Sequence, residues 1–395
     1  MLTRQGWLCG WAGVGLLVLA RLLGIGELFV LGAVMLLLLV ASGLYVRLTR
    51  LDLHVDRVVH PARVHVGQLS RVEVRVRNLR AASTPVLRLR DAVTGTAGAE
   101  LLVPPLDQGA ASAASYRLPT DRRGVLQVGP LRVVVGDPFG LVQSTVEAAP
   151  RVDVTVLPRV DNVRTVPLTT GHDPLAGVLQ PHALGRTGDD FYALRAYVVG
   201  DDLRRIHWPS TARHDELLVR QQEQPWQGRT TVLLDVRRAA HDARSLERAV
   251  SAAASIIVAN STRRDLVRLA TTDGSDSGFG TGTPHLQALL EHLAVVEASG
   301  SASLRSMIDV VQRDGQGALV LIVGQTADDE LRATTRLRQR FGMVGVVRVT
   351  GGSTGAPPTA ASVVVVGDDA PFAPAWNQAM AVAGRTTPHA ARAAR

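Results

Sequence analysis

The stretch from Gly185 to Glu223 reads GRTGDDFYALRAYVVGDDLRRIHWPSTARHDELLVRQQE, and the apolar run Thr230–Val236 (TTVLLDV) comes almost directly after it. Carboxylates, arginines and a tryptophan alternate here more densely than elsewhere in the chain. A polar segment of this kind that leads into a buried strand is more than a solvated loop needs. The stretch therefore marks the entry to a folded domain, and it divides the rest of the chain into an upstream and a downstream part.

Downstream of this stretch, apolar strand patterns alternate with helical ones. A strand–helix alternation of this kind predicts a parallel sheet covered by helices on both faces. We expect helices at Ser245–Asn260 (with Ser245 as its cap), Pro284–Glu297, Leu304–Arg313 and Asp328–Arg340. We expect strands at Thr230–Val236, Leu266–Thr271, Ala318–Val323, Met343–Val349 and Ser362–Val366. The tail from Gly384 to Arg395 is polar and basic, which predicts disorder.

Upstream, from Leu51, apolar and polar residues alternate with a period of two, which is typical of half-buried strands. The clearest examples are Arg71–Arg77, Val86–Arg90 and Val152–Val156, and turn residues such as Gly129-Pro130 separate the runs. Several short strands without a helical period predict an all-β sandwich.

The first fifty residues contain two apolar runs, Trp7–Leu23 and Leu28–Val46, separated by a short break with two glycines. A membrane span needs about 20 apolar residues, so the pair predicts a transmembrane hairpin. Arg4 precedes the first run and Arg47 and Arg50 follow the second, which by the positive-inside rule places the soluble parts in the cytoplasm. The alternative is a signal peptide followed by one anchor, but no cleavage site of the usual kind follows the first run.

Composition argues against one class of function and gives no sign of an oxidising compartment. The formal net charge is +8, and every residue in the Lys+Arg class is arginine. The arginines are spread along the chain and aromatic residues are sparse, so a nucleic-acid binder is not expected. The chain has one cysteine, Cys9, inside an apolar run, so no disulfide can form within the chain and an oxidising compartment is not indicated.

The polar stretch resembles the signature of the domain of unknown function 58 family. The residues that carry this resemblance are Phe191, Leu194, Arg195, Tyr197, Gly200, Asp201, Asp202, Arg204, Ile206, Trp208, Ala212, Arg213, Leu217, Val219 and Arg220. A second run, Arg122–Leu141 (RRGVLQVGPLRVVVGDPFGL), is also similar to the family. We expect the residues of that second run to have a structural role and no chemical one, with Phe139 closing the end of the sandwich.

The resemblance implies that the downstream half is a von Willebrand factor A-like α/β domain. Many such domains hold a divalent metal with an Asp-x-Ser-x-Ser sequence after the first strand, and with hydroxyl and carboxylate oxygens from later loops. Here Asp235 keeps the first position, whereas Arg237 and Ala239 replace the two serines and Gly324-Gln325 replaces the later carboxylate. We therefore predict a degenerate site at Asp235 and Arg237, with no metal and no cofactor.

Three functions compete for the polar stretch. A structural and protein-docking role is the main one, and its interaction residues are Asp201, Asp202, Arg204, Arg205, Ile206, Trp208, Arg213 and Arg220. In this role Asp202 caps a short helix, and Ile206 and Trp208 pack between the sandwich and the α/β domain. The first alternative is a metal-dependent hydrolase that uses the carboxylates and His207 between Asp201 and Glu223. The second is a phosphate or nucleic-acid binder that uses the arginines beside Trp208.

The sequence thus predicts five parts: a transmembrane hairpin (1–50), a β-sandwich (51–158), the signature linker (159–228), a von Willebrand factor A-like, Rossmann-like α/β domain (229–369), and a C-terminal helix with a disordered tail (370–395). We expect a non-enzymatic scaffold at the bacterial plasma membrane. The family resemblance further implies that it works beside a MoxR-type AAA+ ATPase, as its adaptor, and a transglutaminase-like membrane protein.

Overall fold

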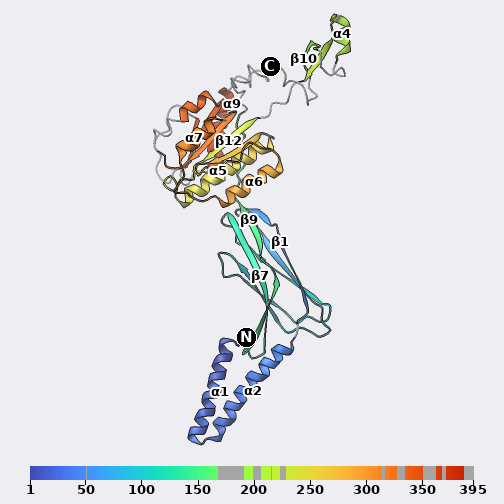
Figure 1. Ribbon diagram of the computed structural model, residues 1–395, viewed down its shortest axis with the longest axis vertical. Coiled ribbons are helices and arrows are strands. Elements are labelled where there is room, and N and C mark those ends of the chain that lie inside the picture. The colour runs from blue at the N-terminus through green and yellow to red at the C-terminus, as the bar shows by residue number, and fades with distance from the viewer. Residues whose placement is uncertain are drawn as a thin grey trace. The chain divides into compact units, whose positions relative to one another are not determined.

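The computed structural model describes residues 1–49, 51–167, 191–198, 206–214, 216–222, 228–313, 316–326, 334–349, 362–366 and 371–386. The chain forms two compact units, Met1–Pro158 and Arg159–Arg395. Figure 1 shows the elements of each unit.

The first unit begins with two apolar helices, α1 (Arg4–Leu23) and α2 (Gly26–Leu48). The Thr3 hydroxyl accepts a hydrogen bond from the Gly6 N–H and caps α1, and Gly24 ends that helix with φ = 70°, a conformation that favours glycine. Both helices are long and apolar enough to cross a membrane. They pack against each other as a hairpin, at the two apolar runs that the sequence indicates (Figure 1).

The rest of the first unit is built from two sheets. One has the order β1-β3-β6; the other has the order β2-β9-β7-β4-β5, with β8 paired to β7. The valines of β3 pack against leucines of β4 and valines of β7 and β9 in one core, which makes the unit a two-sheet sandwich. The strands are β1 (Leu53–His60), β2 (Arg63–His65), β3 (Arg71–Asn78), β4 (Leu87–Val93), β5 (Ala99–Val103), β6 (Ala111–Arg117), β7 (Gly124–Gly136), β8 (Gln143–Ala149) and β9 (Val152–Leu157).

A buried ion pair crosses the core of the sandwich. The Arg57 guanidinium lies 3.0 Å from the Asp91 carboxylate, and their side chains are 2% and 1% exposed. The Tyr116 hydroxyl donates to the other oxygen of Asp91 at 2.6 Å, so the network joins β1, β4 and β6. Burial, followed by the hydrogen bond to Asp91, raises the pKa of Tyr116.

The turn between β7 and β8 corrects one expectation. Phe139 does not close the end of the sandwich, because 61% of its surface is exposed. The turn is held instead by Asp137, whose two carboxylate oxygens accept the N–H groups of Phe139 at 2.9 Å and of Val142 at 2.6 Å. The prediction for Phe139 is therefore wrong, and the side chain projects from a turn that is fixed from within.

The second unit contains a five-stranded parallel sheet with the order β13-β12-β14-β15-β16. In Figure 1, α5 and α6 lie on one side of this sheet and α7 on the other. The strands are β12 (Arg229–Leu234), β13 (Leu266–Thr271), β14 (Ala318–Val323), β15 (Met343–Val349) and β16 (Ser362–Val366). The helices are α5 (Ala243–Thr262), α6 (Thr283–Val295), α7 (Leu304–Arg313) and α9 (Phe372–Thr386), with a 3₁₀ helix, η2, at Thr334–Gln339.

Three local predictions for this unit need correction. The cap of α5 is Asp242, and Ser245 sits at the third helical position, where it completes a capping box. Within the predicted helix Asp328–Arg340, the described part forms the 3₁₀ helix. The predicted tail starts at Gly384, but α9 extends to Thr386, and the residues after it lie outside the described part of the chain.

Residues 159–167, the first of the second unit, run along α5 and are hydrogen-bonded to it. The main-chain N–H of Asp161 donates to the Ser255 hydroxyl at 2.9 Å, and the N–H of Val166 donates to the Asn260 side chain at 3.1 Å. Trp376 of α9 is fully buried, and its indole N–H donates to the Arg164 carbonyl at 2.8 Å. The first residues of the predicted linker are thus part of the α/β fold.

Candidate functional site

The order of the parallel strands singles out one edge of the sheet. From β12 the chain crosses to β13 on one side and then returns to β14 on the other. In open α/β sheets, the crevice outside the carboxyl ends of two such strands is the usual place for a ligand. Asp235 and Arg237 follow β12, Thr272 follows β13 and Thr326 follows β14, so all four come to this edge.

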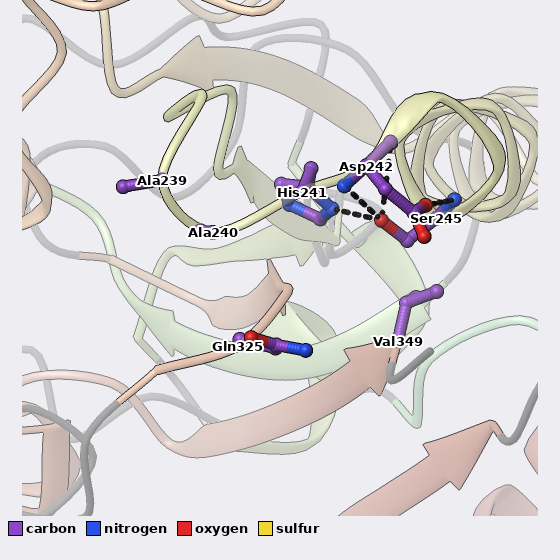
Figure 2. A pocket seen from close by; sticks show the side chains of 7 residues that line it. All are labelled: Ala239, Ala240, His241, Asp242, Ser245, Gln325 and Val349. Atoms are coloured by element: carbon purple, nitrogen blue, oxygen red, sulfur yellow. Dashed lines mark hydrogen bonds between the residues drawn. The ribbon is translucent and has the colours of Figure 1, made fainter. Parts of the chain in front are cut away.

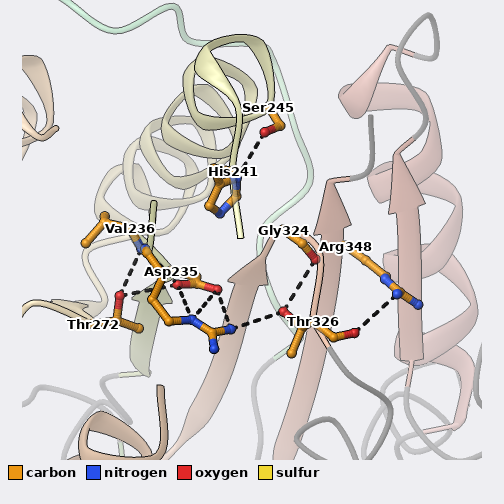
Figure 3. Close-up of polar contacts among 9 residues, drawn as sticks. Asp235, Val236, His241, Ser245, Thr272, Gly324, Thr326 and Arg348 are labelled. Atoms are coloured by element: carbon orange, nitrogen blue, oxygen red, sulfur yellow. Dashed lines mark hydrogen bonds and ion pairs between the residues drawn. The ribbon is translucent and has the colours of Figure 1, made fainter. Parts of the chain in front are cut away.

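Asp235 (labelled in Figure 3) is fully buried, and its carboxylate accepts hydrogen bonds from the Arg237 side chain. The Arg237 side chain donates from Nε to Oδ1 at 3.0 Å and from Nη2 to Oδ2 at 2.9 Å. The main-chain N–H of Arg237 donates to Oδ1 at 3.0 Å, and the Thr272 hydroxyl donates to the same oxygen at 3.3 Å. Both carboxylate oxygens therefore accept bonds from the protein itself, in the two-point geometry that suits arginine.

The guanidinium of Arg237 also reaches across to the next strand. Its Nη2 lies 3.3 Å from the Thr326 hydroxyl, so it links the loops after β12 and β14. A second cation, Arg348 of β15, donates to the Thr326 carbonyl at 3.3 Å. The Arg237 side chain is 18% exposed, so part of it meets solvent at the edge of the sheet.

This arrangement does not suit a divalent cation. A metal at Asp235 would need the lone pairs that now accept hydrogen bonds from Arg237 and Thr272, and it would lie beside a guanidinium. In the parts of the chain that the structure describes, no three His, Cys, Asp or Glu side chains are grouped as a metal site would require. Among the described residues at this edge, the Asp273 carboxylate after β13 is also used within the fold, because it accepts the Thr271 hydroxyl at 2.5 Å and the Ser275 N–H at 3.0 Å.

Gly324 explains why no side chain replaces the missing carboxylate at the end of β14. A Cβ atom at Gly324 would lie 2.0 Å from the Ala240 carbonyl oxygen and 2.8 Å from Cε1 of His241. The loop after β12 therefore packs directly on the backbone of the loop after β14, and the Gln325 N–H donates to the Ala240 carbonyl at 2.8 Å. Close backbone contact, rather than a ligand, fills this position.

A pocket of about 190 Å³ lies beside this contact (Figure 2). Its lining residues are Ala239, Ala240, His241, Asp242, Ser245, Gln325 and Val349. The first turn of α5 lies at its wall, where the Asp242 carboxylate accepts the Ser245 N–H at 2.7 Å and the Ser245 hydroxyl accepts the Asp242 N–H at 2.9 Å. The N–H of Ser245 holds the pKa of Asp242 below its usual value. The helix end is thus capped by its own side chains.

His241 connects the pocket to the Asp235 site. The side chain is buried, with Nδ1 3.3 Å from the Ser245 hydroxyl. Burial lowers the pKa of His241, and the charge of Asp235 acts in the opposite direction without reversing the shift. His241 is therefore neutral at physiological pH, and adds no further positive charge beside Arg237.

The signature stretch forms a separate small element in the described residues. Strands β10 (Phe191–Ala196) and β11 (Leu218–Gln222) pair antiparallel, and the short helix α4 (Trp208–His214) precedes β11. Ile206 and Val219 are paired and buried, whereas Trp208 is 63% exposed. His207 has Nδ1 2.8 Å from the Ser210 hydroxyl, as part of the start of α4.

The other predicted interaction residues are placed less completely. Arg213 is exposed on α4, and Arg220 lies on β11. Asp201, Asp202, Arg204 and Arg205 lie outside the described residues. Ile206 and Trp208, the residues predicted to pack between two domains, are described: Ile206 is buried and paired with Val219 of the same element, whereas Trp208 is exposed, and the packing between domains stays a prediction. The carboxylate cluster of the hydrolase alternative is likewise mostly outside them, since Asp215 and Glu223 are also not described.

Sequence reasoning missed three residues of the site: Thr272, Thr326 and His241. Thr272 and Thr326 are hydroxyl residues that closely follow apolar strands, and parallel strands bring such positions to one edge. That rule could have found them once the strands were assigned. His241 gives no comparable signal, because its contacts depend on how the loop after β12 folds back to α5.

Comparison with known proteins identifies one domain. Residues 193–369 match the family model described as "Protein of unknown function DUF58". No curated protein matches the chain.

Among solved structures, the CARDB domain of a Pyrococcus furiosus protein, crystallised with di-metal ions, is 23% identical over 27% of this chain and 89% of its own, with a TM-score of 0.22. The putative ApaA protein of Bordetella pertussis is 16% identical over 27% of this chain and 96% of its own, with a TM-score of 0.17. Cwp6 of Clostridium difficile is 11% identical over 75% of this chain and 37% of its own, with a TM-score of 0.17. Similarity this low carries no conclusion about fold or function.

Proposed function

We propose that this protein is a membrane-anchored, non-enzymatic scaffold whose von Willebrand factor A-like domain binds a partner protein without a metal ion. The observation that carries the proposal is the pairing of Arg237 with the buried Asp235 carboxylate. In a metal-dependent domain of this kind, an ion at this edge would present positive charge to an acidic group of the partner. Here the guanidinium of Arg237, which is part of the chain, would take over that role.

A fixed guanidinium changes what the edge can do. Arg237 is partly exposed, and its donors are oriented by Asp235 and Thr326, so the edge keeps a polar, ordered surface whether or not a cation is present. Reaction chemistry would need a carboxylate, hydroxyl or imidazole free to accept or move a proton. Asp235 is engaged with both Arg237 and Thr272, and the Thr272 hydroxyl also accepts the Val236 N–H, which favours recognition over catalysis.

The membrane part of the proposal rests on the hairpin. Two helices of suitable length and composition supply the anchor. Arg4 lies at the start of α1 and Arg47 near the end of α2, and by the positive-inside rule these two helix ends face the cytoplasm. The sandwich and the α/β domain then lie on the cytoplasmic side of the plasma membrane.

The partner that we propose is a MoxR-type AAA+ ATPase, for which this protein would act as a membrane adaptor, together with a transglutaminase-like membrane protein. This part depends on the family resemblance of the signature stretch and not on the geometry of the site. The match of residues 193–369 to the family supports it, because that range includes both the described signature elements and the α/β domain.

Capture of the ATPase from detergent-solubilised membranes by the intact protein tests the proposal. We expect capture by the wild type and loss of capture when residues 193–369 are deleted. Trp208→Ala removes an exposed side chain of the signature and should weaken capture, whereas Val295→Ala, at the exposed end of α6, should not. No capture by the intact protein, or equal capture after the deletion, would contradict the adaptor role.

A further inference from the structure

We propose that the turn Asp137–Val142, with Phe139 at its tip, rests in the interfacial layer of the lipid bilayer beside the hairpin. The sandwich would then be held against the membrane surface as well as tethered to it by the chain. This inference depends on the proposed membrane anchoring, and goes beyond it by assigning a lipid contact to the sandwich itself.

The hairpin fixes where the membrane surface lies. Helices of 20 and 23 residues are about 30–35 Å long at 1.5 Å per residue, which matches the hydrocarbon core of a bilayer. Trp7, Trp11 and Tyr45 are exposed near the ends that join the sandwich, and tryptophan and tyrosine favour the interface between lipid and water. Those ends therefore lie at the interfacial layer.

The turn is attached to these same ends. The Thr3 N–H donates to the Leu141 carbonyl at 2.9 Å, and the Thr3 hydroxyl donates to the Gly140 carbonyl at 2.6 Å. The chain's first amino group donates to the Gln143 carbonyl at 2.6 Å. Since Thr3 caps α1, the turn lies at the level of the first turn of that helix.

Apolar side chains of the turn also pack against the two helices. Leu141 and Val142 form a buried cluster with Val46 of α2, and Cys9, Leu38 and Leu39 pack against it. At Gly6 the contact is so close that a Cβ atom would lie 2.1 Å from the Leu141 carbonyl oxygen. Leu141 thus reaches beside residues that belong to the membrane-spanning helices, and Phe139 is two residues away.

The turn is rigid enough to hold an exposed aromatic ring in place. Burial alone would raise the pKa of Asp137, but the N–H groups of Val142 and Phe139 donate to its carboxylate and hold the pKa below its usual value. Gly140 completes the turn with φ = 69°. A phenylalanine that is 61% exposed is unfavourable in water, and gains free energy when its ring enters the interfacial layer.

A second apolar side chain lies at the same end of the sandwich. Asn78 pairs with Leu53 at the start of β1, and the next residue, Leu79, donates its N–H to the Asp52 carbonyl and is 51% exposed. Leu69 lies just before the other end of β3, and is 69% exposed. Both leucines are largely exposed, but they lie at opposite ends of β3 and so at opposite ends of the sandwich. Leu69 is therefore a matched control.

Spin labels on the full-length protein in vesicles of phosphatidylcholine and phosphatidylglycerol test the inference. Cys9→Ala removes the single native cysteine, and Phe139→Cys, Leu79→Cys, Leu69→Cys and Val30→Cys then carry one nitroxide each. Accessibility to oxygen relative to a water-soluble nickel complex reports the depth of each label. We expect a ratio several-fold higher at Phe139 and at Leu79 than at Leu69, and the highest ratio at Val30, on the exposed surface of α2.

The Val30 label separates the two proposals. A lipid-like ratio at Val30 with an aqueous ratio at Phe139, equal to that at Leu69, would overturn the lipid contact and leave the anchoring intact. An aqueous ratio at Val30 would overturn both.

Discussion

Arg237 and Asp235 are the residues on which the site depends. An isolated buried carboxylate is costly, and a protein can offset that cost with a metal ion or with a cation of its own. This chain uses its own cation, two residues along the same loop, and uses Thr272 to complete the hydrogen bonds. In the described residues, a cation of the chain itself therefore balances the buried charge of Asp235.

Arg237→Ala should destabilise the α/β domain. The substitution leaves the buried Asp235 carboxylate without its cation, and the loss of one partner of such a pair costs about 3 kcal/mol. Hydrogen exchange of the β12 and β14 amides in the full-length protein measures this loss.

Arg238→Ala is the control for this prediction, because the neighbouring Arg238 is exposed and should contribute less than about 0.5 kcal/mol. Equal protection of β12 in the two variants would mean that the Arg237 pair does not support the fold.

His241 should make the stability of the α/β domain depend on pH. Its pKa in the folded protein lies below its unfolded value of about 6.5, because burial disfavours the charged ring. The stability from the neutral ring is fully present above the unfolded pKa, and is lost as the pH falls through the folded one. The free energy of unfolding, followed from about pH 8 to pH 5, should therefore fall less in His241→Gln than in the wild type. Identical pH profiles would contradict this.

The two sheets of the sandwich are joined by charge as well as by apolar packing. Arg57 occupies an inward position of β1, where the alternation of the strand would call for an apolar residue, and its partner Asp91 comes from β4 of the other sheet. Tyr116 of β6 completes the contact. A buried network of this type restricts how the sheets can be aligned, because any shift leaves a charge without a partner.

Asp91→Ala should therefore lower the stability of the sandwich by about 3–5 kcal/mol. Tyr116→Phe, which removes one hydrogen bond, should cost about 1 kcal/mol. Both are read from hydrogen exchange of the β3 and β4 amides. Glu100→Ala serves as the comparison, since the Arg88–Glu100 pair is half exposed and should be worth less than about 1 kcal/mol. A similar loss in Asp91→Ala and Glu100→Ala would rule out a special role for the buried pair.

The contact between α1 and the β7–β8 turn should fail when Gly6 gains a side chain. In Gly6→Ala the new methyl group would collide with the Leu141 carbonyl, and the turn would have to move away from the helix. Faster hydrogen exchange at Val142 and Gln143 would report this movement. Gly15→Ala lies on the same helix with open space around its Cβ and should leave the exchange unchanged. Unchanged exchange in Gly6→Ala would show that the turn does not rest on α1.

At the scale of the whole chain, the strands and helices are easier to predict than their contacts. The sequence predicts Leu266–Thr271 and Ala318–Val323 with their observed bounds, because each is a short apolar run between clear breaks. It predicts Ser245 as the cap of α5 where the structure has Asp242, since both residue types accept N–H bonds at a helix start. It predicts a buried Phe139 because apolar residues are usually buried, whereas the structure leaves this side chain exposed on a turn that Asp137 holds.

The site is predictable to the extent that it lies within one loop. Asp235 and Arg237 stand two residues apart, so a single motif contains both. Thr272 and Thr326 come from other strands, and only the order of the sheet brings them together. The close contact of Gly324 with the loop after β12 depends on backbone geometry, which a sequence pattern does not specify.

The most direct test is a titration of the intact protein with manganese, for the wild type and for Asp235→Ala. The electron paramagnetic resonance signal of the free ion measures how much manganese stays unbound. Because Arg237 already occupies the Asp235 carboxylate, we expect the two proteins to bind manganese equally, with no saturable site that the substitution removes. Saturable binding in the wild type that is lost in Asp235→Ala would show that a metal ion displaces the arginine, and would contradict recognition by a metal-free edge.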